Sequence, residues 1–95
     1  MKVYKIKAEL EGLVYWYSAY RHKLDLNEDE AQIFIDKKSA EFMVKQTRLE
    51  ETVAYETEVR LGSYGANENT EVLELWKMAK IVEYDLTPTG VEYDV

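Results

Sequence analysis

Two segments near the start of the chain, the first of them alternating, constrain its fold more than any other feature. In residues 3–10 every second side chain is apolar, with charged residues between them, which is typical of a half-buried β-strand. Residues 13–20 follow as a second apolar and aromatic segment. Glu11 and Gly12 separate the two segments, and a two-residue loop with a glycine is typical of a tight β-hairpin.

The two-residue loop sets the register of this predicted hairpin. Lys7 then lies across from Trp16 on one face, while apolar side chains meet one another on the other face. The predicted apolar pairs are Leu10 with Leu13, Ala8 with Tyr15, Ile6 with Tyr17, and Tyr4 with Ala19.

The middle of the chain predicts one helix followed by further strands. Asp36 suits the N-cap position, and the apolar spacing after it predicts a helix to about residue 50. Residues 52–61 alternate and are predicted as a strand. Residues 71–86 fit either a helical stripe or one long strand. Their β-branched and aromatic side chains favour the strand, with a bulge near residues 77–80.

Shorter patterns complete the predicted architecture. Residues 32–36 and 91–95 are predicted as short strands, residues 62–69 as a loop, and residues 87–90 as a turn. The chain of 95 residues is expected to form a single domain. We therefore predict an α+β fold, in which an antiparallel sheet of about five strands has one helix packed on a face, in the order β-β-β-α-β-β-β.

The composition narrows the chemistry that the chain can perform. It contains no cysteine, which excludes disulfides, thiolate catalysis and cysteine-based zinc sites. Its first residues lack the apolar core of a signal peptide. The longest apolar run, residues 13–17, is far shorter than the roughly 20 residues that cross a bilayer. We therefore expect a cytoplasmic protein.

No motif of the sequence is typical of an enzyme. His22 is the only histidine, and its neighbours Arg21 and Lys23 disfavour its charged form instead of making it a base. The glycines at positions 62 and 65 lack the third glycine and the strand–helix context of a dinucleotide-binding motif. We expect a non-enzymatic protein without a cofactor.

An acidic segment in the first half of the chain has some features of a calcium-binding loop. Asp25, Asn27 and Asp29 occupy the first, third and fifth positions of an EF-hand loop. Its sixth position is Glu30 instead of glycine, and its twelfth is Asp36 instead of glutamate. We interpret the segment as a solvated loop without a metal site, in which Asn27 caps a short helical turn and Glu30 completes a capping box.

The distribution of charge suggests a partner. The net charge is −7, and residues 52–95 hold nine acidic side chains against three basic ones. On neighbouring strands, outward carboxylates would lie about 4.8 Å apart across strands and about 7 Å apart along them. This spacing is similar to that of duplex phosphates and suits a basic protein, although such carboxylates can also serve solubility alone. The predicted contact residues are Glu56, Glu58, Glu74, Glu83 and Asp85.

A second predicted surface combines aromatic and basic side chains in residues 15–23. Alternation would expose Trp16 and Tyr20 on the side of Lys5 and Lys7. Aromatic platforms beside cations bind single-stranded nucleic acids. The acidic net charge opposes phosphate binding, and Trp16 can instead pack under the helix, so direct nucleic-acid binding is the alternative. Its residues are Trp16, Tyr20, Arg21 and Lys23.

The segment 29–45 carries a Glu-Ala-x-x-Phe pattern followed by a helix that begins with Ser39 and Ala40, after a Val-Tyr-Lys-Ile-Lys opening hairpin. It resembles small accessory proteins of bacteriophages and mobile elements of Gram-positive bacteria. The resemblance implies a setting of conflict between phage and host. Small acidic proteins there often inhibit nucleic-acid-binding defence enzymes, as anti-CRISPR and anti-restriction proteins do. It transfers no catalytic residue.

These observations lead to one expected function and two alternatives. We expect an inhibitor that binds a basic, nucleic-acid-binding host protein through an acidic surface in the host cytoplasm. The alternatives are a nucleic-acid-binding or regulatory module and a protein that sequesters a small molecule between sheet and helix. We expect no membrane partner, and a sheet edge could pair two copies as a homodimer.

Overall fold

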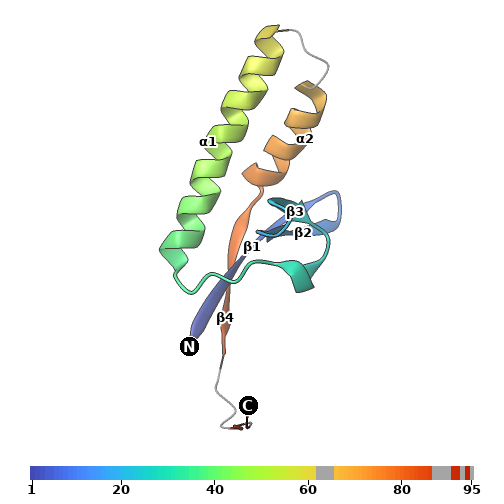
Figure 1. The fold of residues 1–95 in the computed structure, drawn as a ribbon. Helices are drawn as coiled ribbons and strands as arrows, with labels where there is room; N and C mark the ends of the chain where they lie inside the picture. Colours follow the sequence, from blue (N-terminus) through green and yellow to red (C-terminus); the bar gives the residue numbers. More distant parts are fainter. Residues whose placement is uncertain (62–65, 87–90, 93, 95) are drawn as a thin grey trace.

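The computed structural model describes residues 1–61, 66–86, 91–92 and 94, with the backbone alone for residues 66–70. Its elements are β1 (Lys2–Leu10), β2 (Leu13–Ser18), β3 (Lys23–Asp25), the short 3-10 helix η1 (Glu28–Glu30), α1 (Lys37–Leu61), α2 (Ala66–Lys77) and β4 (Lys80–Asp85). The fold is α+β, as predicted. An antiparallel sheet in the order β3-β2-β1-β4 carries a hairpin of two helices (Figure 1).

The N-terminal hairpin has the predicted register. Leu10 pairs with Leu13 and Lys7 pairs with Trp16. The two turn residues, at positions 11 and 12, have φ angles of 52° and 79°. Both angles lie in the left-handed region that a two-residue hairpin turn requires. Local sequence therefore determines this element, because the turn and the alternation agree on one register.

The segment that precedes α1 changes the far end of this hairpin. The Gln32 N–H donates to the Tyr17 carbonyl at 2.8 Å, and Phe34 exchanges two hydrogen bonds of 2.8 Å with Tyr4. The predicted pair of Tyr4 with Ala19 is thus replaced by a bridge between Tyr4 and Phe34. The strand predicted before the helix consists of this single bridge.

Helix α1 is much longer than predicted. Asp36 caps it as predicted, because its Oδ1 accepts a hydrogen bond from the Lys38 N–H at 2.9 Å. The helix continues to Leu61, so the strand predicted over residues 52–61 is wrong. No glycine or proline occurs between residue 37 and Gly62. The helix therefore has no stop signal before that glycine, and packing against α2 favours its continuation.

The segment after α1 also differs from its prediction. Residues 66–77 form α2, and the strand favoured for residues 71–86 exists only as β4. Leu73 and Trp76, three residues apart, are 5% and 3% exposed. This spacing puts both side chains on one helical face. The helical alternative is therefore correct for residues 71–77, and the strand alternative is correct for residues 80–85.

The predicted elements near the C-terminus are only partly described. Residues 91, 92 and 94 have no regular secondary structure, so they do not support the predicted closing strand. The predicted turn at residues 87–90 and residues 62–65 of the predicted loop lie outside the described residues. The remainder of that loop belongs to α2.

The core lies between one face of the sheet and the first half of α1. Ile6 of β1 and Ala40 of α1 are both 0% exposed, and Val44 is 5% exposed. Trp76 of α2 adds its ring edge-on to Tyr17, with centroids 5.8 Å apart. Burial of one large apolar side chain contributes roughly 1.5–3 kcal/mol. This cluster therefore anchors the helical hairpin at its sheet end.

Arg48 joins α1 to the end of α2. Its Nε donates to the Trp76 carbonyl at 2.7 Å, and its Nη2 donates to the carbonyls of Ala79 at 3.0 Å and Lys77 at 3.3 Å. The last carbonyls of a helix lack partners within the helix, and a cation there interacts favourably with the helix dipole. Arg48 thus acts as a C-cap supplied by another element.

The outer face of α1 carries apolar side chains among charged ones. Phe42, Leu49 and Val53 are 68%, 60% and 54% exposed. Charged residues such as Lys45 and Glu56 recur between them. In the part of the chain that the structure describes, no helix is both long and apolar enough to cross a bilayer.

Candidate functional site

The five predicted acidic contact residues do not form one surface. Glu56 and Glu58 lie on α1 and Glu74 lies on α2, whereas Glu83 and Asp85 lie on β4. The tip of the helical hairpin and the free end of β4 point to opposite ends of the molecule (Figure 1). The predicted grid of carboxylates on neighbouring strands is therefore wrong, because residues 52–61 are helical.

A smaller acidic surface remains on the helical hairpin, over the second half of α1 and over α2. We call it the acidic tip, and its residues are Glu56, Glu58, Glu71 and Glu74. Arg60 is the one base among the described side chains from residue 54 to residue 74. Glu74 pairs with Lys77 at 3.7 Å. For the other three members, no ion pair is found within the described part of the chain.

The two acidic residues of β4 are neutralised by nearby cations. The Lys2 Nζ lies 3.4 Å from Glu83 Oε2, and the N-terminal ammonium of Met1 lies 3.5 Å from Asp85 Oδ1. Lys2 is the first residue of β1 and Met1 directly precedes it, so both pairs join this segment to the edge strand β4. Exposed pairs of this kind stabilise little, but they leave these carboxylates less available to an external partner.

Trp16, from the predicted aromatic and basic surface, is occupied by a side chain of the protein itself. The Lys5 ammonium lies 5.7 Å from the centroid of the Trp16 ring and 5.1 Å from that of Tyr84. Glu28 is the third residue around this ammonium, because it lies 3.6 Å from Lys5 Nζ and accepts a 3.2 Å hydrogen bond from the Tyr84 hydroxyl. Burial and the charge of Glu28 raise the pKa of Tyr84, which keeps this hydroxyl a donor.

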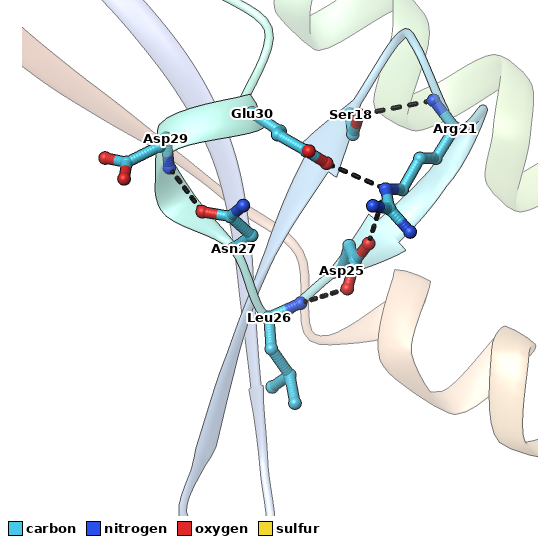
Figure 2. A network of polar contacts seen from close by, with 7 residues as sticks. All are labelled: Ser18, Arg21, Asp25, Leu26, Asn27, Asp29 and Glu30. Atoms are coloured by element: carbon cyan, nitrogen blue, oxygen red, sulfur yellow. Dashed lines mark hydrogen bonds and ion pairs between the residues drawn. The ribbon is translucent and has the colours of Figure 1, made fainter.

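Arg21 is likewise paired within the molecule, as Figure 2 shows. Its Nε lies 2.7 Å from Glu30 Oε2 and 3.2 Å from Asp25 Oδ2. The hydrogen bond that Arg21 donates to Glu30 and the charges of both carboxylates raise the pKa of Arg21. Tyr20 is 86% exposed in the neighbouring turn. Two of the four predicted residues, Trp16 and Arg21, are thus engaged internally.

The acidic segment around η1 forms a cap. Asn27 Oδ1 accepts a hydrogen bond from the Asp29 N–H at 3.0 Å (Figure 2), as predicted. Glu30 contacts Arg21 through its side chain and does not complete the expected capping box. Over the described residues, no group of three or more possible protein ligands could hold a metal ion.

A cavity of about 460 Å³ lies between the β2–β3 end of the sheet and the two helices. Tyr17, Met43 and Trp76 contribute apolar and aromatic walls from three different elements. Binding sites for small molecules have volumes of roughly 300–1,000 Å³ and are mostly apolar, with a few polar groups. The volume of the cavity lies in this range, and six of its eleven lining residues are apolar or aromatic.

The titratable side chains that line this cavity differ between its walls. His22 and Lys23 come from the sheet side, and Glu50 and Glu51 come from α1. Glu50 accepts a 3.2 Å hydrogen bond from Gln46. For the side chains of His22, Lys23 and Glu51, no hydrogen bond or ion pair is found among the described residues.

The environment of Glu51 opposes its ionisation. Burial and the adjacent charge of Glu50 raise the pKa of Glu51. His22 has a φ of 53° in an exposed turn, and the structure gives it no carboxylate partner within the described chain.

Sequence reasoning missed the contribution of α1 to this cavity. Thr47 and Glu51 fall at i+3 and i+7 from Val44, on the buried face of α1. The helical period therefore contained a signal for this wall. The alternation of residues 52–61 hid it, because it placed the end of the helix at residue 50.

Comparison with protein-family models, with curated proteins and with solved structures finds no match for this chain. A function must therefore be argued from the charge and geometry of the chain itself.

Proposed function

We propose that this chain is a non-enzymatic protein that binds and inhibits a basic, nucleic-acid-binding host protein. The acidic tip carries the proposal. Its four carboxylates stand on a helical hairpin that projects beyond the sheet (Figure 1). A field of one sign on a projecting element steers an oppositely charged partner and aligns it.

The shape of the molecule supports this role for the hairpin. The principal extents are 59 × 27 × 24 Å, so one end can enter a groove while the sheet remains outside. Helices hold their side chains at fixed positions along the hairpin, which limits the conformational entropy lost on binding. The resemblance to phage accessory proteins is consistent with an inhibitor of anti-restriction or anti-CRISPR type.

The contact set that we propose differs from the one predicted from sequence. Glu56, Glu58 and Glu74 are kept, and Glu71 joins them on the exposed side of α2. Glu83 and Asp85 are left out, since they pair with cations at the other end of the molecule.

A pair of matched charge reversals tests this proposal. The tip variant combines Glu56→Lys with Glu71→Lys, and the control combines Glu83→Lys with Asp85→Lys, so that both change the net charge equally. Each protein is immobilised, and DNA-binding proteins from a nuclease-treated bacterial lysate are eluted with increasing salt. We expect the tip variant to lose the retained basic proteins and the control to keep them. Circular dichroism checks that each variant is folded.

Equal retention by wild type and tip variant would contradict the proposal. Equal loss by both variants would indicate that net charge alone explains the attraction. A positive result is then sharpened by adding duplex DNA, which should compete for the captured protein if the tip occupies its nucleic-acid groove.

A further inference from the structure

The cavity between the sheet and the helices is lined by a lysine, a histidine and a glutamate without partners among the described residues. Lys23 and His22 line it from the β3 side, and Glu51 lines it from α1. None of their side chains forms a hydrogen bond or ion pair with another described residue. Glu51 is partly exposed, and partial burial of a carboxylate without a partner disfavours its charged form.

The space between these charges is largely apolar. Tyr17, Leu24, Met43, Leu75 and Trp76 contribute to the lining, and the aromatic pair of Tyr17 and Trp76 is itself part of the packed core. A ligand that places an apolar body here would remove apolar surface from water. A ligand with a charge at each end would also pair with the groups on both walls.

We propose that this cavity binds a short apolar zwitterion, such as an aromatic dipeptide. Its ammonium group would pair with Glu51, its carboxylate with Lys23, and its side chains would lie against Trp76 and Met43. An unblocked dipeptide carries its two charges at opposite ends of an apolar body, and the volume of about 460 Å³ accommodates it. The site does not use the acidic tip and is independent of the proposed inhibition.

The experiment uses three related peptides and one fluorescent reporter. Trp76 and Trp16 are the only two tryptophans, so Trp16→Phe leaves Trp76 in the cavity wall as the sole reporter. Phe-Phe is titrated beside N-acetyl-Phe-Phe, which lacks the ammonium, and Phe-Phe amide, which lacks the carboxylate. We expect saturable binding of Phe-Phe and about tenfold weaker binding of each blocked peptide, as for the loss of one charge-assisted hydrogen bond.

Variants of Glu51 and Lys23 test which charge of the peptide each wall of the cavity binds. Glu51→Gln should lower the affinity for Phe-Phe about tenfold and leave the affinity for N-acetyl-Phe-Phe unchanged. Lys23→Gln should also lower the affinity for Phe-Phe about tenfold, but leave the affinity for Phe-Phe amide unchanged. Glu92→Gln and Lys45→Gln replace exposed residues that do not line the cavity, and these controls should leave the affinity for all three peptides unchanged. The proposal is overturned by an absence of saturable binding, by equal affinity for all three peptides, or by variants that weaken all three peptides alike. Because the readout is fluorescence of the isolated protein, its failure leaves the capture experiment on the acidic tip unaffected.

Discussion

The sheet end and the tip of the helical hairpin are built on different physical principles. At the sheet end, Ile6, Ala40 and Val44 are almost fully buried, and cations pair with the acidic residues of β4. At the tip, the second half of α1 contributes no side chain to the buried core, and Arg60 is the one base beside its acidic residues. Stability is therefore concentrated at one end and unbalanced charge at the other.

This difference indicates that substitutions at the two ends should affect different properties of the protein. Substitutions at the sheet end remove packing and reduce the free energy of unfolding, whereas substitutions at the tip alter the field that a partner meets. The two ends are coupled through Arg48 and Trp76, which hold α2 against α1 and the sheet. The following changes test that division.

The largest effect is expected from a cavity in the core. Ile6→Ala should lower the free energy of unfolding by about 2–5 kcal/mol, because it removes a fully buried side chain. Val53→Ala on the exposed outer face of α1 should change it by no more than about 0.5 kcal/mol. Urea denaturation followed by circular dichroism measures both. Similar losses for the two variants would contradict the division between the ends.

Removing the cap on α2 should have the next largest effect. Arg48→Met deletes three hydrogen bonds to carbonyls at the end of that helix and should cost about 1–3 kcal/mol. Arg60→Met is the control, since it makes the same replacement at an exposed position. Hydrogen exchange should show faster opening of α2 only in the first variant. If both variants exchange alike, Arg48 does not position the helix.

A smaller effect is expected from the contacts of Lys5 with Tyr84 and Glu28. Tyr84→Phe removes the hydrogen bond to Glu28 but keeps the ring over the ammonium. The free energy of unfolding should fall by about 0.5–1 kcal/mol, whereas Tyr20→Phe at a highly exposed position should leave it unchanged. Thermal denaturation compares them. A larger loss for Tyr20→Phe would show that the exposed turn has a structural role.

Replacing Glu51 should stabilise the protein, but only at a pH at which its carboxyl group is ionised. The raised pKa of Glu51 means that its ionised form costs more in the folded state than in the unfolded one, so stability falls as pH rises through the folded pKa. Glu51→Gln should therefore increase the free energy of unfolding at neutral pH. The gain should shrink as pH falls through the raised folded pKa and vanish below the ordinary value for a glutamate.

The exposed Glu56→Gln serves as the reference for this pH series, because it removes the same charge from the outer face of α1. A gain of equal size and pH dependence in both variants would reflect net charge alone. A gain confined to Glu51→Gln would show that the cavity keeps a carboxylate at a cost in stability, as a binding site does.

Features that depend on residues close together in the sequence were predictable, whereas features that depend on contacts between distant segments were not. The hairpin register and the Asp36 cap depend on residues within a few positions of one another, and both were predicted correctly. The continuation of α1 over residues 52–61 was not, since alternation and helical period overlap there. Packing of α1 against α2 decides between them, and no local pattern records that contact.

The candidate sites show the same dependence on range. The sequence alone established an acidic chain without cysteine, a fixed N-terminal hairpin and a capped helix. Only the tertiary structure separated Glu56 and Glu58 from Glu83 and Asp85, because the helical hairpin and β4 run to opposite ends of the molecule. Likewise, only folding brought Lys23 and Glu51 to one cavity. These two residues, nearly thirty positions apart in the sequence, line the same cavity because burial of Trp76 and Tyr17 places α1, α2 and the sheet around a common core.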